Sequence, residues 1–229
     1  MARIQLQGVS HRFDSPGADW VLRDLDLELT QSRIGVVGGN GSGKSTLARL
    51  LNGLVHPYAG SVLVDGQDTV KDGPRVRRTV GFVFTDPDAQ IVMPTVAEDV
   101  AFSLRRRRLS KPQVAEAVAQ ALGQVGLDGL GERPAHLLSG GQKQLLAIAS
   151  VLAVQPQVLV CDEPTTLLDA RNSRRVAQLL AELDQQVVLV THDLDSLSGF
   201  DRVLVVDGGR VVADDSPAPA LDWYRRLVG

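Results

Sequence analysis

Residues 38–45 have the composition and spacing of a phosphate-binding loop. They read Gly-Gly-Asn-Gly-Ser-Gly-Lys-Ser and satisfy the pattern G-x-x-x-x-G-K-[ST]. Because glycine lacks a Cβ, the backbone N–H groups of such a loop can point inward around phosphate oxygens. Lys44 would reach the β- and γ-phosphates of a nucleotide, and Ser45 would offer its hydroxyl to Mg²⁺. The alternative is a glycine-rich turn with an incidental lysine, but an apolar run precedes the loop and a helical stretch follows it.

A second candidate for chemistry is the acidic pair Asp162 and Glu163. The pair follows the apolar residues Val-Leu-Val-Cys at 158–161. Burying one carboxylate is costly, so two adjacent ones at the end of a buried strand usually serve a purpose. Asp162 would hold Mg²⁺, directly or through a water, and Glu163 would polarise the attacking water. The alternative is a solvated turn after the strand, and the phosphate-binding pattern argues against it.

The elements that position these residues are predicted to alternate between strand and helix. Apolar and polar residues alternate at 4–9 and again at 25–29, so the first 30 residues should form strands. Apolar runs predict further strands at 34–37, 61–65, 79–84, 158–161 and 187–190. Helices are predicted over about 44–54 and 170–185, and a hairpin is predicted around Asp207-Gly208-Gly209. Together these elements indicate an α/β core.

The middle of the chain is predicted to be mostly helical. Capping-box spacing occurs three times, at 95–98, 110–113 and 139–142, so a helix should begin at each, the last two ending near 125 and 154. We expect one domain over residues 1–229. Within it, residues 2–87 and 155–229 would form the core with an antiparallel β subdomain, and 88–154 would form an inserted helical subdomain.

The composition excludes several classes of protein. The chain is 44% hydrophobic and 22% charged, which is ordinary for a globular domain with a core. A formal charge of -3 and 4% aromatic residues give no basic field and few stacking platforms for nucleic acid. The single cysteine, Cys161, fits a reducing compartment. No signal-peptide pattern and no membrane-spanning run of apolar residues occurs, so a membrane partner would have to be a separate chain.

Residues 138–144, Leu-Ser-Gly-Gly-Gln-Lys-Gln, resemble the signature motif of ATP-binding cassette (ABC) proteins. The resemblance covers about residues 2–214 and implies an ABC ATPase fold, with a RecA-like core of the P-loop NTPase type. It implies that residues 139–142 contact the γ-phosphate of ATP held by the opposite subunit of a head-to-tail homodimer. Physically, Ser139 would cap a helix whose N-terminus faces an anion. The alternative is a helix cap and nothing more.

The resemblance assigns roles to three further residues. His192 stands where the family keeps its switch histidine, Asp169 lies in the segment that crosses to the other subunit, and Phe13 would stack on adenine. For Phe13, a core aromatic is the alternative. Catalysis is expected to involve Glu163, His192 and Lys44. The residues expected to bind ATP are Phe13, Gly38, Gly39, Asn40, Gly41, Ser42, Gly43, Lys44, Ser45, Thr46, Ser139, Gly140, Gly141, Gln142 and Asp169.

The segment at 80–90 resembles the family's Q-loop but departs from it at one position. Thr85 stands where the family usually has a glutamine that reaches Mg²⁺ and the attacking water. Ser45, Asp162 and Thr85 are therefore the expected metal-binding residues, although threonine has a much shorter reach. Gln90 is the nearest other amide, and its distance along the chain places it outside the expected site.

Residues 86–104 resemble the P-x-x-Q…P-T-V-x-x-D-V-A-F pattern of ATPases in energy-coupling factor (ECF) importers of vitamins and transition metals. The resemblance implies a transmembrane coupling (T) protein and a substrate-binding membrane (S) protein as partners. It also implies a peripheral location on the cytoplasmic face of the inner membrane. The short C-terminus favours the biotin-type importer.

Two other classes of function compete with an importer subunit. A soluble ABC ATPase acting on nucleic acid or ribosomes would have a second cassette, a coiled-coil insertion or basic extensions, and none is present. A regulatory nucleotide-binding module is disfavoured by the intact Lys44, Asp162, Glu163 and His192. Four arginines, Arg105, Arg106, Arg107 and Arg108, form either a solvated turn or a contact with anionic lipid or an acidic partner. The segment at 223–226 is expected either to pack on the domain or to contact a partner.

Overall fold

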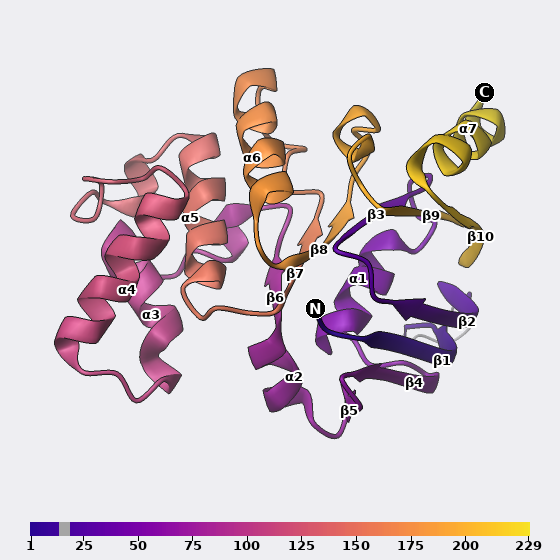
Figure 1. Ribbon diagram of the computed structural model, residues 1–229, viewed down its shortest axis with the longest axis horizontal. Helices are drawn as coiled ribbons and strands as arrows, with labels where there is room; N and C mark the ends of the chain where they lie inside the picture. The colour runs from indigo at the N-terminus through magenta and orange to yellow at the C-terminus, as the bar shows by residue number, and fades with distance from the viewer. Residues whose placement is uncertain (14–18) are drawn as a thin grey trace. The chain divides into compact units, whose positions relative to one another are not determined.

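The computed structural model describes residues 1–13 and 19–229, which form two units (Figure 1). The first unit comprises Met1–Phe82, Gln157–Glu163 and Leu183–Gly229, and the second comprises Val83–Pro156 and Pro164–Glu182. The domain limits expected from the sequence stay a prediction. The predicted fold class is confirmed, because the chain combines a largely parallel sheet, an antiparallel sheet and a set of helices.

A six-stranded sheet places the candidate site residues at the carboxyl ends of adjacent strands. Its order is β10-β9-β3-β8-β7-β6. The strands are β3 (Arg33–Val37), β6 (Val80–Val83), β7 (Val158–Asp162), β8 (Gln186–Val190), β9 (Arg202–Asp207) and β10 (Arg210–Asp215). β8 runs parallel to both β3 and β7, with Val190 level with Val36 on one side and Asp162 on the other. The phosphate loop, the acidic pair and Thr191-His192 therefore follow three adjacent strands at their carboxyl ends, where α/β sheets bind ligands.

The antiparallel sheet has the order β2-β1-β4-β5. It contains β1 (Ile4–His11), β2 (Leu22–Leu29), β4 (Ala59–Val64) and β5 (Gln67–Asp68), and Figure 1 shows β1, β2 and β4 side by side. In β1 the predicted alternation holds for the buried Ile4 and Leu6, and Val9 is buried beyond a shift in register. In β2, Leu25 and Leu29 are buried but Leu27 is only half-buried. This sheet carries Phe13 just beyond the end of β1.

Local signals gave most boundaries of the first unit correctly. Helix α1 (Lys44–Asn52) stops two residues earlier than predicted, because Gly53 takes the left-handed conformation at φ 71° and closes the helix. The β9–β10 hairpin is confirmed, and its turn residues Gly208 and Gly209 both have positive φ, as a type I′ turn requires. Helices α2 (Gly73–Thr79) and α7 (Pro217–Val228) were not predicted. α7 packs on β9 and β10 and buries Leu221, so the C-terminal segment does pack on the domain.

The second unit is built from four helices. They are α3 (Val96–Ser103), α4 (Lys111–Gln124), α5 (Gly140–Leu152) and α6 (Ala170–Glu182), with the 3-10 turns η1 (Pro87–Ala89), η2 (Leu104–Arg106) and η3 (Ala135–Leu137) between them. A further 3-10 turn, η4 (Asp195–Leu197), lies in the first unit. α3, α4 and α5 pack against one another (Figure 1). All three predicted capping boxes are present, at Thr95, Ser110 and Ser139.

Two helices end before their predicted limits. α5 ends at Leu152 instead of near 154, and α6 ends at Glu182 instead of near 185. Beyond α6, the carbonyl oxygens of Leu183 and Gln185 accept hydrogen bonds from the Arg33 guanidinium, at 2.7 Å for Gln185. These long-range contacts replace the helical hydrogen bonds there. Among the described residues, no helix has the length and apolar character needed to cross a membrane.

Candidate functional site

The phosphate loop is held by its own lysine and by tight packing. Lys44 is buried, and its Nζ donates hydrogen bonds to the carbonyl oxygens of Gly38 at 2.9 Å and Gly39 at 2.8 Å. Gly38 has a φ of +155°, and a Cβ added there would lie 2.1 Å from the carbonyl oxygen of Val206. Glycine is therefore required at this position by close approach to β9. Burial lowers the pKa of Lys44, while the charges of Glu163 and Asp162 act in the opposite direction.

Ser45 and Asp162 meet although they are far apart in the sequence. Ser45 Oγ donates to Asp162 Oδ1 at 2.8 Å, and an Arg49 nitrogen lies 3.4 Å from Asp162 Oδ2. The Asp162 side chain is only 2% exposed, and its burial raises the pKa of this carboxyl, partly offset by the Ser45 hydrogen bond and the Arg49 charge. A hydroxyl and a carboxylate are the hard oxygen donors that Mg²⁺ prefers, so these two residues fit that ion.

The Glu163 and His192 side chains are in contact at the adjoining strand ends. His192 Nε2 lies 2.7 Å from Glu163 Oε1, and the Glu163 backbone N–H donates to the Val190 carbonyl at 3.0 Å. Glu163 has a φ of +51°, an uncommon conformation for a residue with a side chain. Such backbone strain persists where the surrounding structure imposes it, and it clusters at functional sites.

Phe13 lines an open cavity with the phosphate loop. The cavity has a volume of about 520 Å³ and is bordered by Phe13, Val21, residues 40–46 and Glu163. Phe13 is 51% exposed, so the alternative interpretation as a core aromatic is wrong. Its ring is free on the cavity side to stack on a planar group.

An arginine-centred cluster braces the end of β1 beside Phe13, and the sequence gave no signal for it. Arg12 donates to the Tyr58 hydroxyl at 2.8 Å, and its guanidinium lies 4.4 Å from the Tyr58 ring centre and 5.2 Å from that of Trp20. Cation–π contacts of this kind orient the guanidinium over the rings. The cluster therefore fixes the residue that precedes Phe13.

In the second unit, the Ser139 motif begins α5 with a complete capping box. Ser139 Oγ accepts from the Gln142 N–H at 3.3 Å, and Gln142 Oε1 accepts from the Ser139 N–H at 3.0 Å. Ser139 and Gly140 are exposed at this helix N-terminus. A Cβ on Gly141 would lie 2.4 Å from Asn172 Cγ, so α5 and α6 approach closely at this point. The motif is thus rigid and presents its N-terminal end to solvent, as anion binding needs.

Asp169 is held by the start of α6. Its carboxylate accepts hydrogen bonds from the N–H groups of Arg171 and Asn172 and from Asn172 Nδ2 at 2.8 Å. The hydrogen bonds from Asn172 lower the pKa of Asp169. Asn172 therefore links Asp169 to Gly141, the second glycine of the signature motif.

The segment around Thr85 is fastened to α5 by three side chains. Gln90 accepts from the Phe84 N–H at 3.2 Å and donates to the Ala147 carbonyl at 3.2 Å, and Gln144 donates to the Phe84 carbonyl at 3.3 Å. Lys143 Nζ lies 2.7 Å from Asp88 Oδ1. The Gln90 amide is therefore engaged within the second unit, and its expected place outside the catalytic site stays a prediction.

Asp99 organises the segment before α3, a role that sequence reasoning missed. Its side chain is buried, Oδ1 accepts from the N–H groups of Val92 at 2.9 Å and Met93 at 3.1 Å, and Oδ2 accepts from Ser150 Oγ at 2.8 Å. The signal was present, because Asp99 is the aspartate of the P-T-V-x-x-D-V-A-F pattern. In this chain, the aspartate of that pattern therefore has a structural role, because it holds the segment before α3 in place.

The expected site residues fall into two groups. The first unit brings together Phe13, residues 38–46, Asp162, Glu163 and His192, and the second contains Thr85, residues 139–142 and Asp169. The first group combines an open cavity, a braced phosphate loop, a hydroxyl–carboxylate pair and a second carboxylate held by a histidine. This is the set that triphosphate binding and water activation require.

Comparison with known proteins gives close relatives over nearly the whole chain. An ABC transporter ATP-binding protein of Deinococcus radiodurans is 54% identical over 225 residues, covering 98% of both chains. The biotin transport ATP-binding protein BioM of Rhizobium etli is 46% identical over 212 residues, covering 93% of this chain and 94% of that protein.

Solved structures show the same architecture. The structure of cbiO1 from Clostridium perfringens, part of the ABC transporter complex cbiONQ, matches with a TM-score of 0.85 and 30% identity over 98% of this chain and 92% of that one. The dimeric ATP-binding cassette MJ0796 bound to ADP and Pi matches with a TM-score of 0.82 and 27% identity, over 93% and 98%. The family model described as ABC transporter matches residues 22–166. The chain is an ATP-binding ATPase that belongs to the ABC transporter family.

Proposed function

We propose that this ATPase is the motor subunit of an ECF-type importer and that it hydrolyses ATP with Mg²⁺. The observation that carries the hydrolytic part is the convergence of Lys44, Ser45, Asp162, Glu163 and His192 at the ends of three adjacent strands. For the importer part, support comes from the relative named BioM and from the structure titled as part of cbiONQ.

The residues of the first unit divide the work of hydrolysis. Phe13 stacks on adenine, and the N–H groups of the loop with Lys44 bind the phosphates. Ser45 and Asp162 hold Mg²⁺, which when bound neutralises phosphate charge. Glu163 accepts a proton from the attacking water, and His192 fixes its carboxylate. The 2.7 Å contact between His192 and Glu163 supports this preorganisation.

We assign the second unit's motifs to a head-to-tail homodimer. Ser139, Gly140, Gly141 and Gln142 would contact the γ-phosphate held by the other subunit, and Asp169 would contact that subunit. The exposed N-terminus of α5 supports this role, and the MJ0796 cassette is a dimer. Thr85 is assigned to the metal shell, where its short side chain would act less directly than a glutamine.

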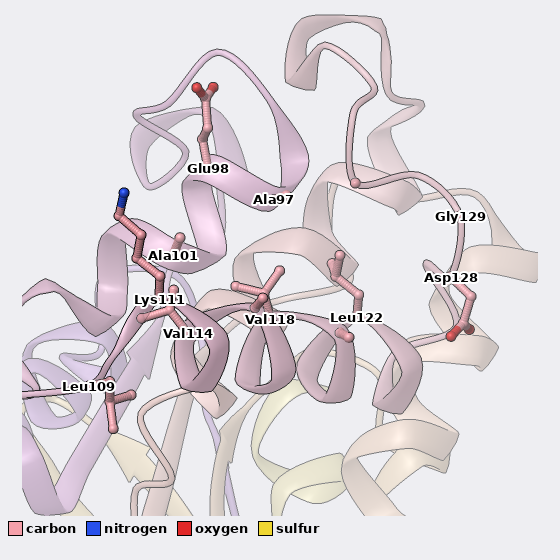
Figure 2. A pocket seen from close by; sticks show the side chains of 13 residues that line it. Ala97, Glu98, Ala101, Leu109, Lys111, Val114, Val118, Leu122, Asp128 and Gly129 are labelled. Carbon is pink, nitrogen blue, oxygen red and sulfur yellow. The ribbon is translucent and has the colours of Figure 1, made fainter.

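An apolar groove in the second unit fits a helical segment of a transmembrane coupling protein. The groove has a volume of about 630 Å³ and lies between α3 and α4. Figure 2 shows Val114, Val118 and Leu122 in a row along α4, with Ala97 and Ala101 on α3. Small alanines leave room for an inserted side chain, while Glu98 and Lys111 at the rim offer one charge of each sign to polar residues of an amphipathic helix.

The transported solute is proposed to be biotin, which a separate S protein would bind. The T protein would link that membrane protein to two copies of this chain on the cytoplasmic face of the inner membrane. Biotin is preferred over a transition metal ion because of the 46% identity to BioM. No observation in the structure favours a nucleic-acid or ribosomal role.

The test is to purify the chain with its membrane partners and to identify the small molecule retained by mass spectrometry. We expect biotin in the complex and ATP-dependent uptake of labelled biotin by vesicles. Glu163→Gln should lower ATP hydrolysis by about 100-fold or more, because a positioned general base contributes roughly 10²–10⁴-fold. A complex that retains a metal ion and no biotin would overturn the substrate. Wild-type hydrolysis by Glu163→Gln would remove Glu163 from the proposed role.

A further inference from the structure

The four consecutive arginines at 105–108 form a basic turn that stands out on the second unit. All four are exposed, whereas Leu104 beside them is buried and anchors the turn at η2. With Lys111 they place five cations between Val100 and Ala115, and no Asp or Glu occurs in that stretch. The turn is therefore strongly positive in a chain whose formal charge is -3.

These guanidinium groups are not neutralised within the chain. Among residues 1–13 and 19–229, no side chain or carbonyl accepts a hydrogen bond from any of the four guanidinium groups and none of them forms an ion pair, while Arg105 lies 4.8 Å from the Phe102 ring centre. Some exposed arginines elsewhere do have acidic partners, since Arg3 faces Glu28 and Arg225 faces Asp222. An unpaired cluster of this density attracts anions from outside the chain.

The neighbouring apolar residues indicate which anion the turn fits. Phe102 is 40% exposed next to the arginines, and Leu109 on the other side is half-buried. An aromatic ring among guanidinium groups suits the interface of a bilayer, where the ring enters the headgroup layer and the cations remain at the phosphates. A fluid lipid surface needs no fixed arrangement of acids, so it can match four adjacent arginines that a rigid acidic protein surface would meet only in part.

We propose that the turn at 105–108, with Phe102, binds anionic phospholipid headgroups and thereby holds the second unit against the membrane. Each cation near an anionic surface strengthens binding by about 1 kcal/mol, which is about fivefold. Removing all four charges should therefore lower the vesicle partition coefficient by about 100-fold or more. The contact adds to whatever affinity a protein partner supplies.

The test is flotation of the purified full chain with vesicles, in the absence of any transport partner. The vesicles contain phosphatidylcholine alone or with about one-third phosphatidylglycerol, at about 0.05 M and about 0.5 M NaCl. We expect binding only to the anionic vesicles and only at the lower salt. Substitution of Arg105, Arg106, Arg107 and Arg108 by glutamine should abolish it, whereas lysine at all four positions should retain it.

The matched control is glutamine at Lys71, Arg75, Arg77 and Arg78, which removes the same charge from exposed positions of the first unit. This variant should still float with anionic vesicles. Basal ATP hydrolysis and the circular dichroism spectrum should be unchanged in both sets. Equal losses in the two sets would overturn the proposal in favour of net charge, and loss in the lysine variant would overturn it in favour of a geometrically specific partner. Failure of the wild-type chain to bind also overturns it, and leaves the proposed transport function untouched because no partner is present.

Discussion

Asp99→Ala is expected to destabilise the second unit strongly, because one buried carboxylate ties three donors together. It accepts the N–H groups of Val92 and Met93 and the hydroxyl of Ser150 at 2.8–3.1 Å. Hydrogen bonds to a charged group contribute about 1.5–3 kcal/mol each. Val92 is 61% exposed, so water can replace the partners of the backbone groups, whereas Ser150 is only 5% exposed.

We therefore expect Asp99→Ala to lower the free energy of unfolding by about 3 kcal/mol, well below the sum of three such bonds. At about 2–4 °C per kcal/mol for a chain of this size, the melting temperature should fall by about 6–12 °C. Urea unfolding followed by circular dichroism gives the free energy, and calorimetry gives the melting temperature. The same variant should weaken binding of the proposed membrane partner, because Asp99 lies on α3, which lines the apolar groove.

Two variants separate the hydrogen bonds from simple loss of volume. Asp99→Asn keeps an acceptor for the two N–H groups, and the Ser150 hydroxyl can rotate to accept from the new amide, so it should cost about 1 kcal/mol. In a double-mutant cycle, Asp99→Ala and Ser150→Ala should show a coupling energy of about 1 kcal/mol. An Asp99→Ala protein within about 0.5 kcal/mol of wild type, or additive effects in the cycle, would refute the reasoning.

Three further predictions follow from contacts in the two units. Gly38→Ala should abolish ATP binding measured by calorimetry, because the new Cβ would lie 2.1 Å from a backbone carbonyl oxygen. Gly39→Ala is the control: its Cβ would have nothing within 4 Å, so its affinity for ATP should stay within about tenfold of wild type. Burial raises the pKa of Asp162 above its ordinary value of 3.8, so folding favours the protonated form of this carboxyl. The stability that this preference contributes is present below pH 3.8, is lost as the pH rises through the raised pKa, and stays lost at neutral pH. Asp162→Asn should therefore raise the melting temperature of the nucleotide-free protein at neutral pH and have no such effect below pH 3.8, and an equal effect at both would contradict the assignment. Either Asp88→Lys or Lys143→Asp alone should lower the free energy of unfolding in urea by about 0.5–1 kcal/mol and reduce partner-stimulated ATP hydrolysis. The double variant with the two charges exchanged should recover both the stability and the hydrolysis. If the exchange recovers neither, the ion pair is not the cause of the losses.

The sequence by itself determined the features that depend on neighbouring residues. The spacing of glycines and Lys44 defined the phosphate loop, the pairs at 95–98, 110–113 and 139–142 defined three helix starts, and Gly208-Gly209 defined the hairpin turn. Each involves φ angles or hydrogen bonds within a few residues, which residue types encode directly. The signature motif additionally identified the family, since that local pattern is rare elsewhere.

Only the tertiary structure decided which distant groups meet. Ser45 reaches Asp162, Glu163 reaches His192 and Asp99 reaches Ser150 because the strand order β3-β8-β7 and the packing of α3 on α5 bring their backbones together. The left-handed backbone of Glu163, the bracing of Phe13 by Arg12 and the end of α6 at Glu182 also depend on long-range contacts. Such contacts form because whole helices and strands are buried against one another, and no local spacing of residues encodes that packing. The sequence therefore identified the candidate catalytic residues, while the fold determined which groups they contact and where the backbone is strained.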